Sequence, residues 1–499
     1  MMDFFRNFPF ICIMLSIVSG PISSVLSGKK ARYFSIFVVS VCEVLSALTL
    51  WYVLKLPEPF VYKMGRFPAP FGNEIRVGVL EALMAVFFCL IMLLSQFGGM
   101  KYLKKDIPEE KQGLYFIMIN LLLASLLSLI YTNDLFTGYV FIEINTIAAC
   151  GLIMIRGWGR NILAATKYMV MSLLGSGLVL ISVSILYGIT GHLLMSNIHE
   201  AVTVIVEEGT YTEPLIIAVG LFTVGIAIKS ALFPFHAWLP DAYGYSTCTS
   251  SAILSSLVSK GYILLLIKFM YRVIGTDIMK MTGADDVMFL FGIAGMIMGS
   301  VDAIQQTDMS RMIAFSSVAQ IGYIYMGFGL GNEAGMVAAT FHILAHASAK
   351  SMLFVAANGL AEVSGGSMNY RDLRGSGIRN RSAGVGFLVG ALSMVGIPLF
   401  AGFTSKVYFA KAAFDSVSGK EIATLIALAI STVLNAMYFV RMAISVYTPK
   451  MNEQYEDKEF RAGTSYRMAM FVFVLIVLIL GILSNPIFDF ISRGLQQFS

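Results

Sequence analysis

Residues 229–241 read Lys-Ser-Ala-Leu-Phe-Pro-Phe-His-Ala-Trp-Leu-Pro-Asp and follow a long apolar run. A charged side chain at the centre of a bilayer costs about 2.5–3.5 kcal/mol on insertion scales, so Lys229 is a functional candidate by default. Pro234 has no N–H to donate to the carbonyl of Ser230, which predicts an interrupted helix beside this lysine. A broken helix with an ionisable group at the break is typical of ion sites in membrane proteins.

The composition extends this prediction to the whole chain. Its 499 residues are 57% hydrophobic and 13% charged, whereas soluble proteins carry about 25% charged residues. Long apolar runs without the alternation of barrel strands predict an all-α polytopic membrane protein. The net charge of +5 lies mostly in loops, so it indicates topology and not a nucleic-acid partner. The five cysteines are scattered, so no metal site, cofactor or disulfide framework is predicted.

About fourteen segments have the length and apolarity of transmembrane spans. They lie near residues 9–27, 32–54, 77–98, 113–131, 134–155, 161–189, 214–235, 247–271, 287–305, 309–329, 334–362, 384–412, 421–446 and 466–491. Basic residues cluster after the odd-numbered spans, and the loop after span six is acidic. The positive-inside rule therefore predicts a multi-pass protein of the cell (inner) membrane with both termini on the outer side.

Titratable side chains inside these spans predict a proton pathway at mid-membrane. They are Glu143 in span five, Lys229 in span seven, Lys260 in span eight, His342, His346 and Lys350 in span eleven, and Lys406 in span twelve. Burial favours the neutral amine of a lysine, whereas a nearby carboxylate favours its charged form, so a Glu143–Lys229 pair can act as a switch. Lysine suits this role because arginine stays charged, and histidine relays protons near neutral pH.

Spans seven and twelve both contain prolines and a lysine, and Lys406 follows Pro398 by eight residues. Because they are five spans apart, they predict two five-helix repeats, spans 4–8 and 9–13, with helices 7 and 12 broken. The predicted division is three N-terminal helices in 1–110, a first repeat in 111–283, a second repeat in 284–447 and a C-terminal helix in 448–499. Pro234, His236 and Asp241 are expected to support the first break.

Some of these residues have simpler interpretations. Lys268 lies near the end of span eight and is expected to snorkel to the interface. The spacing of His342 and His346 suits a metal pair, but the glutamate of an HExxH motif is missing, so metal binding is not predicted. Asp302 and Asp308 flank the end of span nine and are expected to cap helices.

Three motifs together resemble the antiporter-like subunits shared by Mrp-type Na+/H+ antiporters and the membrane arm of complex I. They are residues 229–241, Phe341-His342-Ile-Leu-Ala-His346-Ala-Ser-Ala-Lys350, and Gly396-Ile-Pro-Leu-Phe-Ala-Gly-Phe-Thr-Ser-Lys406. The resemblance covers roughly residues 65–445, and the stretch at 67–72 is similar to the D-type subunits of Mrp antiporters. It implies inverted repeats, with Glu143 and Lys229 as the charge pair of the first one. It also implies Lys260 as the central lysine, a relay in span eleven, and Lys406 as the terminal group.

The chain departs from the family pattern beyond Asp241. Tyr243 stands where family members usually have a histidine, and Thr247 and Thr249 replace the usual prolines. These changes predict a less kinked entry to span eight. They also leave open a variant with altered coupling, as in a relative of the energy-converting hydrogenases.

The leading hypothesis is a proton-translocating subunit of a multi-subunit Mrp-type Na+/proton antiporter, which transports and is not a catalyst by itself. The alternative is a proton- or sodium-pumping membrane subunit of a complex I-related redox complex, either an NADH-quinone oxidoreductase or a membrane-bound hydrogenase. A self-sufficient transporter and a degenerate structural subunit are further hypotheses. The expected partners are other membrane subunits, the lipid bilayer and protons, while passage of Na+ through this chain is left open.

Overall fold

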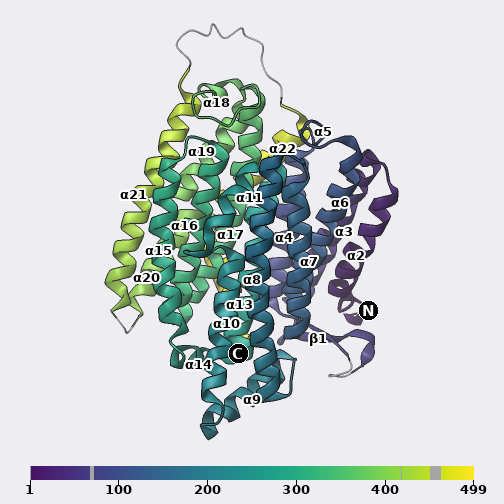
Figure 1. Cartoon of the computed structure of the whole chain (residues 1–499), viewed down its shortest axis with the longest axis vertical. Helices are drawn as coiled ribbons and strands as arrows, with labels where there is room; N and C mark the ends of the chain where they lie inside the picture. Colours follow the sequence, from purple (N-terminus) through teal and green to yellow (C-terminus); the bar gives the residue numbers. More distant parts are fainter. Residues whose placement is uncertain (1, 68–71, 417–418, 450–461, 499) are drawn as a thin grey trace.

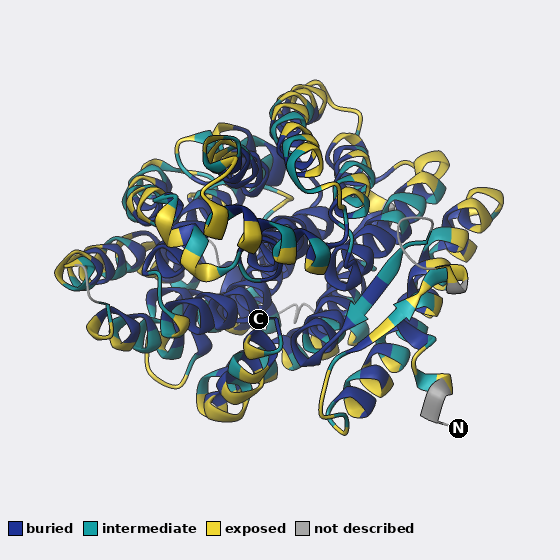
Figure 2. Cartoon of the chain, turned by 90° about the horizontal axis from the view of Figure 1, so that it is seen from below, coloured by how far each residue is buried: buried dark blue, intermediate teal, exposed yellow. Residues whose placement is uncertain are grey.

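The computed structural model of the chain describes residues 2–67, 72–416, 419–449 and 462–498. Residues 68–71, from the stretch that is similar to D-type Mrp subunits, lie outside this range, as do residues 450–461 of the predicted C-terminal segment. The helices run along the long axis of the molecule (Figure 1). Their outward faces are exposed and their inward faces are buried (Figure 2), as expected for a bundle that meets lipid at its perimeter.

Twelve helical segments among the described residues are long and apolar enough to cross a membrane. They are α2 (Phe8–Val25), α3 (Gly28–Val53), α4 (Val79–Gly99), α6 (Glu109–Tyr131), α7 (Leu135–Met154), α8 (Gly159–Thr190), the segments Thr212–Tyr245 and Cys248–Ile274, α15 (Ala284–Gln305), α16 (Met309–Gly329), α21 (Lys420–Tyr447) and α22 (Thr464–Ile482). The all-α polytopic membrane fold is therefore confirmed.

The other two predicted spans differ from these twelve in composition or length. Span eleven forms α17 (Glu333–Glu362), which has the length of a span but carries two histidines and a lysine. Span twelve forms two shorter helices, α19 (Arg381–Val395) and α20 (Ala401–Phe414). The count of fourteen spans stays a prediction, as do the two inverted repeats and their boundaries.

Both predicted interruptions are present in the backbone. Span seven consists of α10 (Thr212–Ser230), the 3-10 turn η2 (Phe235–Trp238) and α11 (Leu239–Tyr245). Two non-glycine residues in the breaks have a left-handed backbone, Ala231 (φ +61°) after α10 and Leu399 (φ +80°) between α19 and α20. Such conformations are found where the surrounding structure enforces them.

Span eight is a composite helix. It contains α12 (Cys248–Ile253), the π-helical turn η3 (Leu254–Val258), α13 (Ser259–Lys268) and a second π-helical turn, η4 (Phe269–Ile274). Its most apolar 18-residue window is wholly buried, and that of α16 is 94% buried. These two segments and α17 therefore form the interior of the bundle.

Glycines allow α15 and α16 to pack at backbone distance. A Cβ added at Gly292 would lie 2.4 Å from the backbone nitrogen of Met326, and one at Gly322 would lie 2.6 Å from the carbonyl oxygen of Gly292. Small residues at such crossings are the usual device for close helix association in membranes. The contact fixes α16 against its neighbours and so positions the polar residues that α16 turns toward α17.

The short elements divide between the two ends of the bundle (Figure 1). One end carries α5 (Leu103–Asp106) and α18 (Ser376–Arg379). The other end carries α9 (Met195–Glu208), α14 (Thr276–Met281) and strand β1 (Phe60–Lys63), which pairs antiparallel with β2 (Glu74–Val77). The chain enters α2 and leaves α23 (Ser484–Gln496) at this second end (Figure 1), so both described termini share one side. The remaining short elements are α1 (Met2–Phe5) and η1 (Met64–Arg66).

Candidate functional site

The first part of the site is an ion pair between α10 and α7. Lys229 is fully buried, one residue before α10 ends. Its Nζ lies 3.6 Å from Glu143 Oε1 and donates a hydrogen bond to Thr146 Oγ1 at 2.7 Å. The Glu143 side chain is 25% exposed, whereas that of Lys229 is not exposed at all. The pair therefore joins the perimeter of this chain to its interior.

The hydroxyl of Tyr262 lies beside this ion pair. The Tyr262 hydroxyl donates to Asn145 Oδ1 at 3.0 Å and lies 3.5 Å from Thr146 Oγ1. Lys229 Nζ lies 5.4 Å from the centre of the Tyr262 ring, within range of a cation–π contact. The sequence analysis missed Thr146 and Tyr262. A signal was available, since Glu143, Asn145 and Thr146 interrupt one apolar run.

Lys260 lies two residues after η3, the first π-helical turn of span eight. It is fully buried, and its Nζ donates to the carbonyl oxygen of Ser255 and to Ser259 Oγ, the latter at 3.2 Å. The Tyr243 hydroxyl donates to the Leu254 carbonyl at 3.2 Å, at the start of the same turn. Tyr243 thus contacts the turn that presents Lys260. Isolated π-helical turns are frequently found at functional sites.

Span eight begins with a threonine cap where the family pattern has a proline turn. The Thr247 side chain accepts a hydrogen bond from the backbone nitrogen of Ser250 at 3.1 Å and so caps the start of α12. A threonine N-cap stabilises a helix start without the restriction that proline imposes. The irregularity in this span lies further along, at Leu254–Val258, a position that the sequence analysis missed.

The three titratable residues of α17 are all buried at the centre of the bundle. His342 Nδ1 lies 2.9 Å from Ser405 Oγ on α20, and the rings of His342 and His346 are 6.1 Å apart. Lys350 Nζ donates to the carbonyl oxygen of Ile313 at 2.8 Å and to the Ser316 hydroxyl, both on α16. Span eight packs against α17 through α12 and η3, where the hydroxyls of Ser256 and Ser351 are hydrogen-bonded to each other.

Lys406 lies at the second break. Its Nζ donates to the Val395 carbonyl at 2.7 Å and to Thr432 Oγ1 at 3.0 Å. Val395 ends α19, and Pro398 lies in the connection to α20, so the amine satisfies a carbonyl that the interrupted helix leaves without an intrahelical partner. The Tyr323 ring contacts both Lys406 and His342, with its centre 5.5 Å from the amine and 5.3 Å from the imidazole centre.

The supporting residues of the first break make contacts with neighbouring helices. His236 Nε2 lies 3.6 Å from Asp302 Oδ2 of α15. Asp241 accepts hydrogen bonds from Lys167 of α8 at 2.6 Å and from Arg311 of α16 at 2.9 Å. The prediction that Asp302 caps a helix is wrong, because its carboxylate faces His236 instead.

At the other flank, Asp308 does cap α16, since its carboxylate accepts from the backbone nitrogen of Arg311 at 3.0 Å. This prediction is confirmed. The cap orients the start of the helix that carries Ser316, which is a partner of Lys350.

The expectation that Lys268 snorkels to the interface is wrong. Its side chain is 0% exposed, and Nζ donates to the carbonyls of Leu129, Ile130 and Thr132 at the end of α6. The last carbonyls of a helix have no intrahelical partner, which explains why a buried amine binds there. One turn further along, Arg272 pairs with the buried Glu81 at 3.4 Å.

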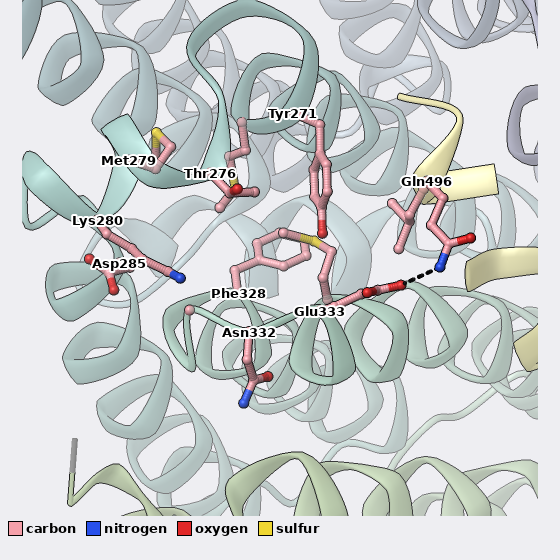
Figure 3. Close-up of a pocket in the computed structure, with 13 residues that line it drawn as sticks. Tyr271, Thr276, Met279, Lys280, Asp285, Phe328, Asn332, Glu333 and Gln496 are labelled. Carbon is pink, nitrogen blue, oxygen red and sulfur yellow. Dashed lines mark hydrogen bonds between the residues drawn. The ribbon is translucent and has the colours of Figure 1, made fainter. Parts of the chain in front are cut away.

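A cavity of about 210 Å³ lies at the end of the bundle where α14 lies. Tyr271, Lys280, Asp285 and Glu333 contribute polar groups to its lining, and methionine and phenylalanine side chains contribute much of the rest (Figure 3). Glu333 accepts hydrogen bonds from Gln496 Nε2 at 3.2 Å and from Ser492 Oγ at 3.1 Å. It begins α17, about 13 Å along the helix from His342 at 1.5 Å per residue. The sequence analysis did not find this cavity.

The described part of the chain offers no ready-made metal site. No group of three or more His, Cys, Asp or Glu side chains among those residues is arranged to hold a metal ion. The predicted series instead contains three kinds of titratable group: the carboxylate of Glu143, the amines of the four lysines and the imidazoles of His342 and His346. Such a series is suited to proton transfer between neighbours.

The fold and the buried series define a class of protein: polytopic helical subunits with lysines at broken transmembrane helices. Residues 132–435 match the family described as "NADH:quinone oxidoreductase/Mrp antiporter, TM". The chain belongs to this family, as its three sequence motifs predict.

Two curated relatives illustrate the breadth of the family. The chain is 33% identical over 403 residues to NADH-quinone oxidoreductase subunit N of Desulforudis audaxviator, covering 80% of this chain and 78% of the relative. It is 26% identical over 440 residues to the D subunit of the Na(+)/H(+) antiporter of Alkalihalophilus pseudofirmus, covering 88% and 86%. Both relatives are named as subunits, so the family supplies parts of multi-subunit membrane complexes.

Two solved structures share the fold. A chain of the archaeal membrane-bound sulfane sulfur reductase matches with a TM-score of 0.88 and 22% identity, over 98% of this chain and 97% of that one. A chain of the Mrp complex from Dietzia sp. DQ12-45-1b matches with a TM-score of 0.88 and 20% identity, over 99% and 97%. At these identities the likeness concerns the fold alone.

Proposed function

We propose that this chain is a proton-translocating subunit of a multi-subunit Mrp-type Na+/proton antiporter. Protons would move along the buried series Glu143, Lys229, Lys260, His342, His346, Lys350 and Lys406. The observation that carries the proposal is the ion pair at the first break, where Lys229 Nζ lies 3.6 Å from Glu143 Oε1 with the lysine fully buried. A buried amine in lipid depends on its carboxylate partner for its charge, so opening the pair releases a proton.

The histidines of α17 support a hydrated centre. Both ring nitrogens of His346 and Nε2 of His342 are buried without a hydrogen-bond partner among the described residues. Buried polar atoms are nearly always hydrogen-bonded, to protein or to ordered water. Water beside these imidazoles would connect Lys260 to the α17 groups and carry protons between them.

Replacing Lys229 with alanine in the assembled complex tests this function. We expect proton-coupled transport to be abolished, measured as the Na+-induced pH change in energised inverted membrane vesicles. Lys411→Ala is the control, because Lys411 is an exposed lysine on α20 and its loss changes the formal charge equally. Native gel electrophoresis of both complexes would verify assembly. Near-normal transport by the assembled Lys229→Ala complex would refute the proposed role.

The membrane orientation belongs to the same proposal. Other membrane subunits would surround the chain in the cell membrane, with both termini on the outer side. The distribution of charge supports this orientation, because α18 and its basic neighbours lie at one end and the acidic α9 lies at the other, beside the described termini (Figure 1). Accessibility of cysteines introduced near α9 and α18 to a membrane-impermeant thiol reagent would test it.

A second candidate is a pumping subunit of a redox-driven complex. It is favoured by the 33% identity to a relative named NADH-quinone oxidoreductase subunit N. The same buried residues would serve either complex, since electron carriers would be bound by partner chains. The composition of the native complex separates the two. Co-purified iron–sulfur proteins favour the redox complex, whereas a set of small membrane subunits without them favours the antiporter.

A further inference from the structure

The four lysines of the buried series share a feature that the sequence motifs do not express. Each donates a hydrogen bond to a side-chain hydroxyl as well as to its other partner. The pairs are Lys229 with Thr146, Lys260 with Ser259, Lys350 with Ser316, and Lys406 with Thr432. The four hydroxyls come from α7, α13, α16 and α21, so they do not belong to one motif or one helix.

Lys268 provides the contrast within the same chain. It is as deeply buried as Lys260 and lies two turns away in the same span, but its three hydrogen bonds all go to backbone carbonyls. An ammonium group has three N–H donors, and three carbonyl acceptors satisfy all of them. If the Lys268 amine lost a proton, its nitrogen lone pair would face one of the carbonyl oxygens, and that oxygen would lose its hydrogen-bond donor. This environment therefore suits a lysine that keeps its charge.

A hydroxyl differs from a carbonyl because it can both donate and accept. Beside an ammonium it accepts an N–H, and beside a neutral amine it can turn its own O–H toward the nitrogen lone pair. When the ammonium passes its proton to a neighbouring water or imidazole, one N–H bond breaks and one O–H or N–H bond forms. The nitrogen keeps the electron pair, and the hydroxyl then donates to it.

Two of the hydroxyls have a second acceptor within reach. Thr146 Oγ1 lies 2.9 Å from the carbonyl oxygen of Ile142, and Ser316 Oγ lies 2.8 Å from that of Ile313. The hydroxyl hydrogen can therefore rest on the helix carbonyl while the lysine is charged. It rotates to the amine when the lysine is neutral, so both protonation states keep a hydrogen-bond partner.

We propose that Thr146, Ser259, Ser316 and Thr432 are positioning residues that let their lysines exchange protons, and that Lys268 lacks such a partner because it is a fixed structural charge. The inference rests on the proposed proton pathway and adds to it a rule for which buried lysines take part. The rule selects a lysine by the chemistry of its acceptors, since burial alone does not separate Lys260 from Lys268.

Thr432 offers the sharpest test, because it is half-buried and its hydroxyl contacts Lys406. Thr432→Val removes the hydroxyl and keeps the shape. We expect the transport rate of the assembled complex to fall about tenfold, the equivalent of one hydrogen bond lost along the path. Thr432→Ser restores a hydroxyl and is expected to return the rate to within about twofold of the wild type.

Thr424→Val is the matched control on the same helix. Thr424 is fully buried, and its hydroxyl has no hydrogen-bond partner among the described residues, so the same substitution leaves every lysine contact in place. We expect wild-type transport from this variant. Equal losses in Thr424→Val and Thr432→Val, or failure of Thr432→Ser to restore transport, would show a packing effect and overturn the inference.

Lysine variants separate this inference from the proposed function. If Lys406→Ala stops transport while Thr432→Val transports at the wild-type rate, the pathway stands and the role of the hydroxyl is refuted. If Lys406→Ala transports normally, the pathway itself fails at this residue, and the inference fails with it. Loss of transport in Lys406→Ala and Thr432→Val, with recovery in Thr432→Ser, supports both.

Discussion

The two broken helices place a lysine at the break in different ways. At the first break Lys229 precedes the interruption and faces a carboxylate on another helix, Glu143. At the second break Lys406 follows the interruption and binds the carbonyl of Val395, where the first half of the same span ends. The partners of Lys229 named above thus both lie on another helix, α7, whereas Lys406 is held in part by its own span and in part by Thr432 of α21. One sequence pattern, proline with lysine, therefore gives two different sets of partners for the amine.

The largest effect is expected from arginine at either break. Lys229→Arg and Lys406→Arg keep the positive charge but cannot release a proton near neutral pH, so both should abolish transport while the complex assembles. Lys268 ends α13 and binds carbonyls at the end of α6, where only charge and hydrogen bonds are needed, so Lys268→Arg should keep most of the transport. Vesicle transport assays of the three variants measure this. Substantial transport by Lys406→Arg would show that the second break needs only a fixed charge.

The second-largest effect is expected from removing the Glu143 carboxylate, a partner that the lysine at the first break has and the lysine at the second break lacks. Glu143→Gln removes the carboxylate and leaves the amine of Lys229 without its ion-pair partner. Breaking a buried ion pair from one side typically costs about 3–5 kcal/mol of stability, and we expect a smaller cost here because Glu143 is partly exposed. For the transport rate we expect about a tenfold to hundredfold loss, because the amine loses the carboxylate that favours its charged form. Glu143→Asp keeps the charge and should retain more activity. Equal transport by the Gln and Asp variants would contradict a switch at the first break.

A smaller effect is expected from Gly396→Ala at the second break. Gly396 has φ +92°, and an added Cβ would lie 2.9 Å from Lys406 Cδ. The alanine is strained by its backbone and displaces the lysine, so we expect a loss of about 1–3 kcal/mol in stability together with slower transport. Thermal unfolding in detergent and the vesicle assay measure the two effects. An unchanged midpoint and unchanged rate would show that the second break tolerates movement.

The smallest effect is expected from glycine at the two left-handed residues of the breaks. Leu399 has φ +80° and is mostly exposed, so Leu399→Gly removes strain and little packing. We expect a gain of about 1 kcal/mol in stability, seen as a higher unfolding midpoint. Ala231→Gly should give a similar gain at the first break, where φ is +61°. A lower midpoint in both variants would contradict strain at these positions.

Much of the site could be predicted because lipid makes ionisable residues conspicuous. Glu143, Lys229, Lys260 and Lys406 each interrupt an apolar run, and an isolated charge in such a run demands a reason. Lys268 meets the same criterion, but its place near the end of a span predicts that its amine reaches the interface. Its actual partners, three carbonyls at and just after the end of α6, are more than a hundred residues away in sequence.

The hydroxyl partners could not be predicted for a related reason. Serine and threonine are common in membrane helices, where they usually bond to their own helix, so their presence near a lysine carries little information. Thr146 and Lys229 are 83 residues apart, and Lys406 and Thr432 meet only because α20 and α21 pack together. The π-helical turn before Lys260 likewise has no mark in the sequence that distinguishes it from regular helix.

The sequence by itself determined the membrane fold, the two interruptions and which ionisable residues stand inside apolar runs. These follow from local chemistry: apolar length, the missing N–H of proline and the desolvation of an amine. Only the tertiary structure decided which buried lysine meets a carboxylate, which meets a hydroxyl and which is enclosed by carbonyls. The physical reason is that a buried side chain takes its partners from whichever helices pack against it, and helix packing depends on the whole bundle.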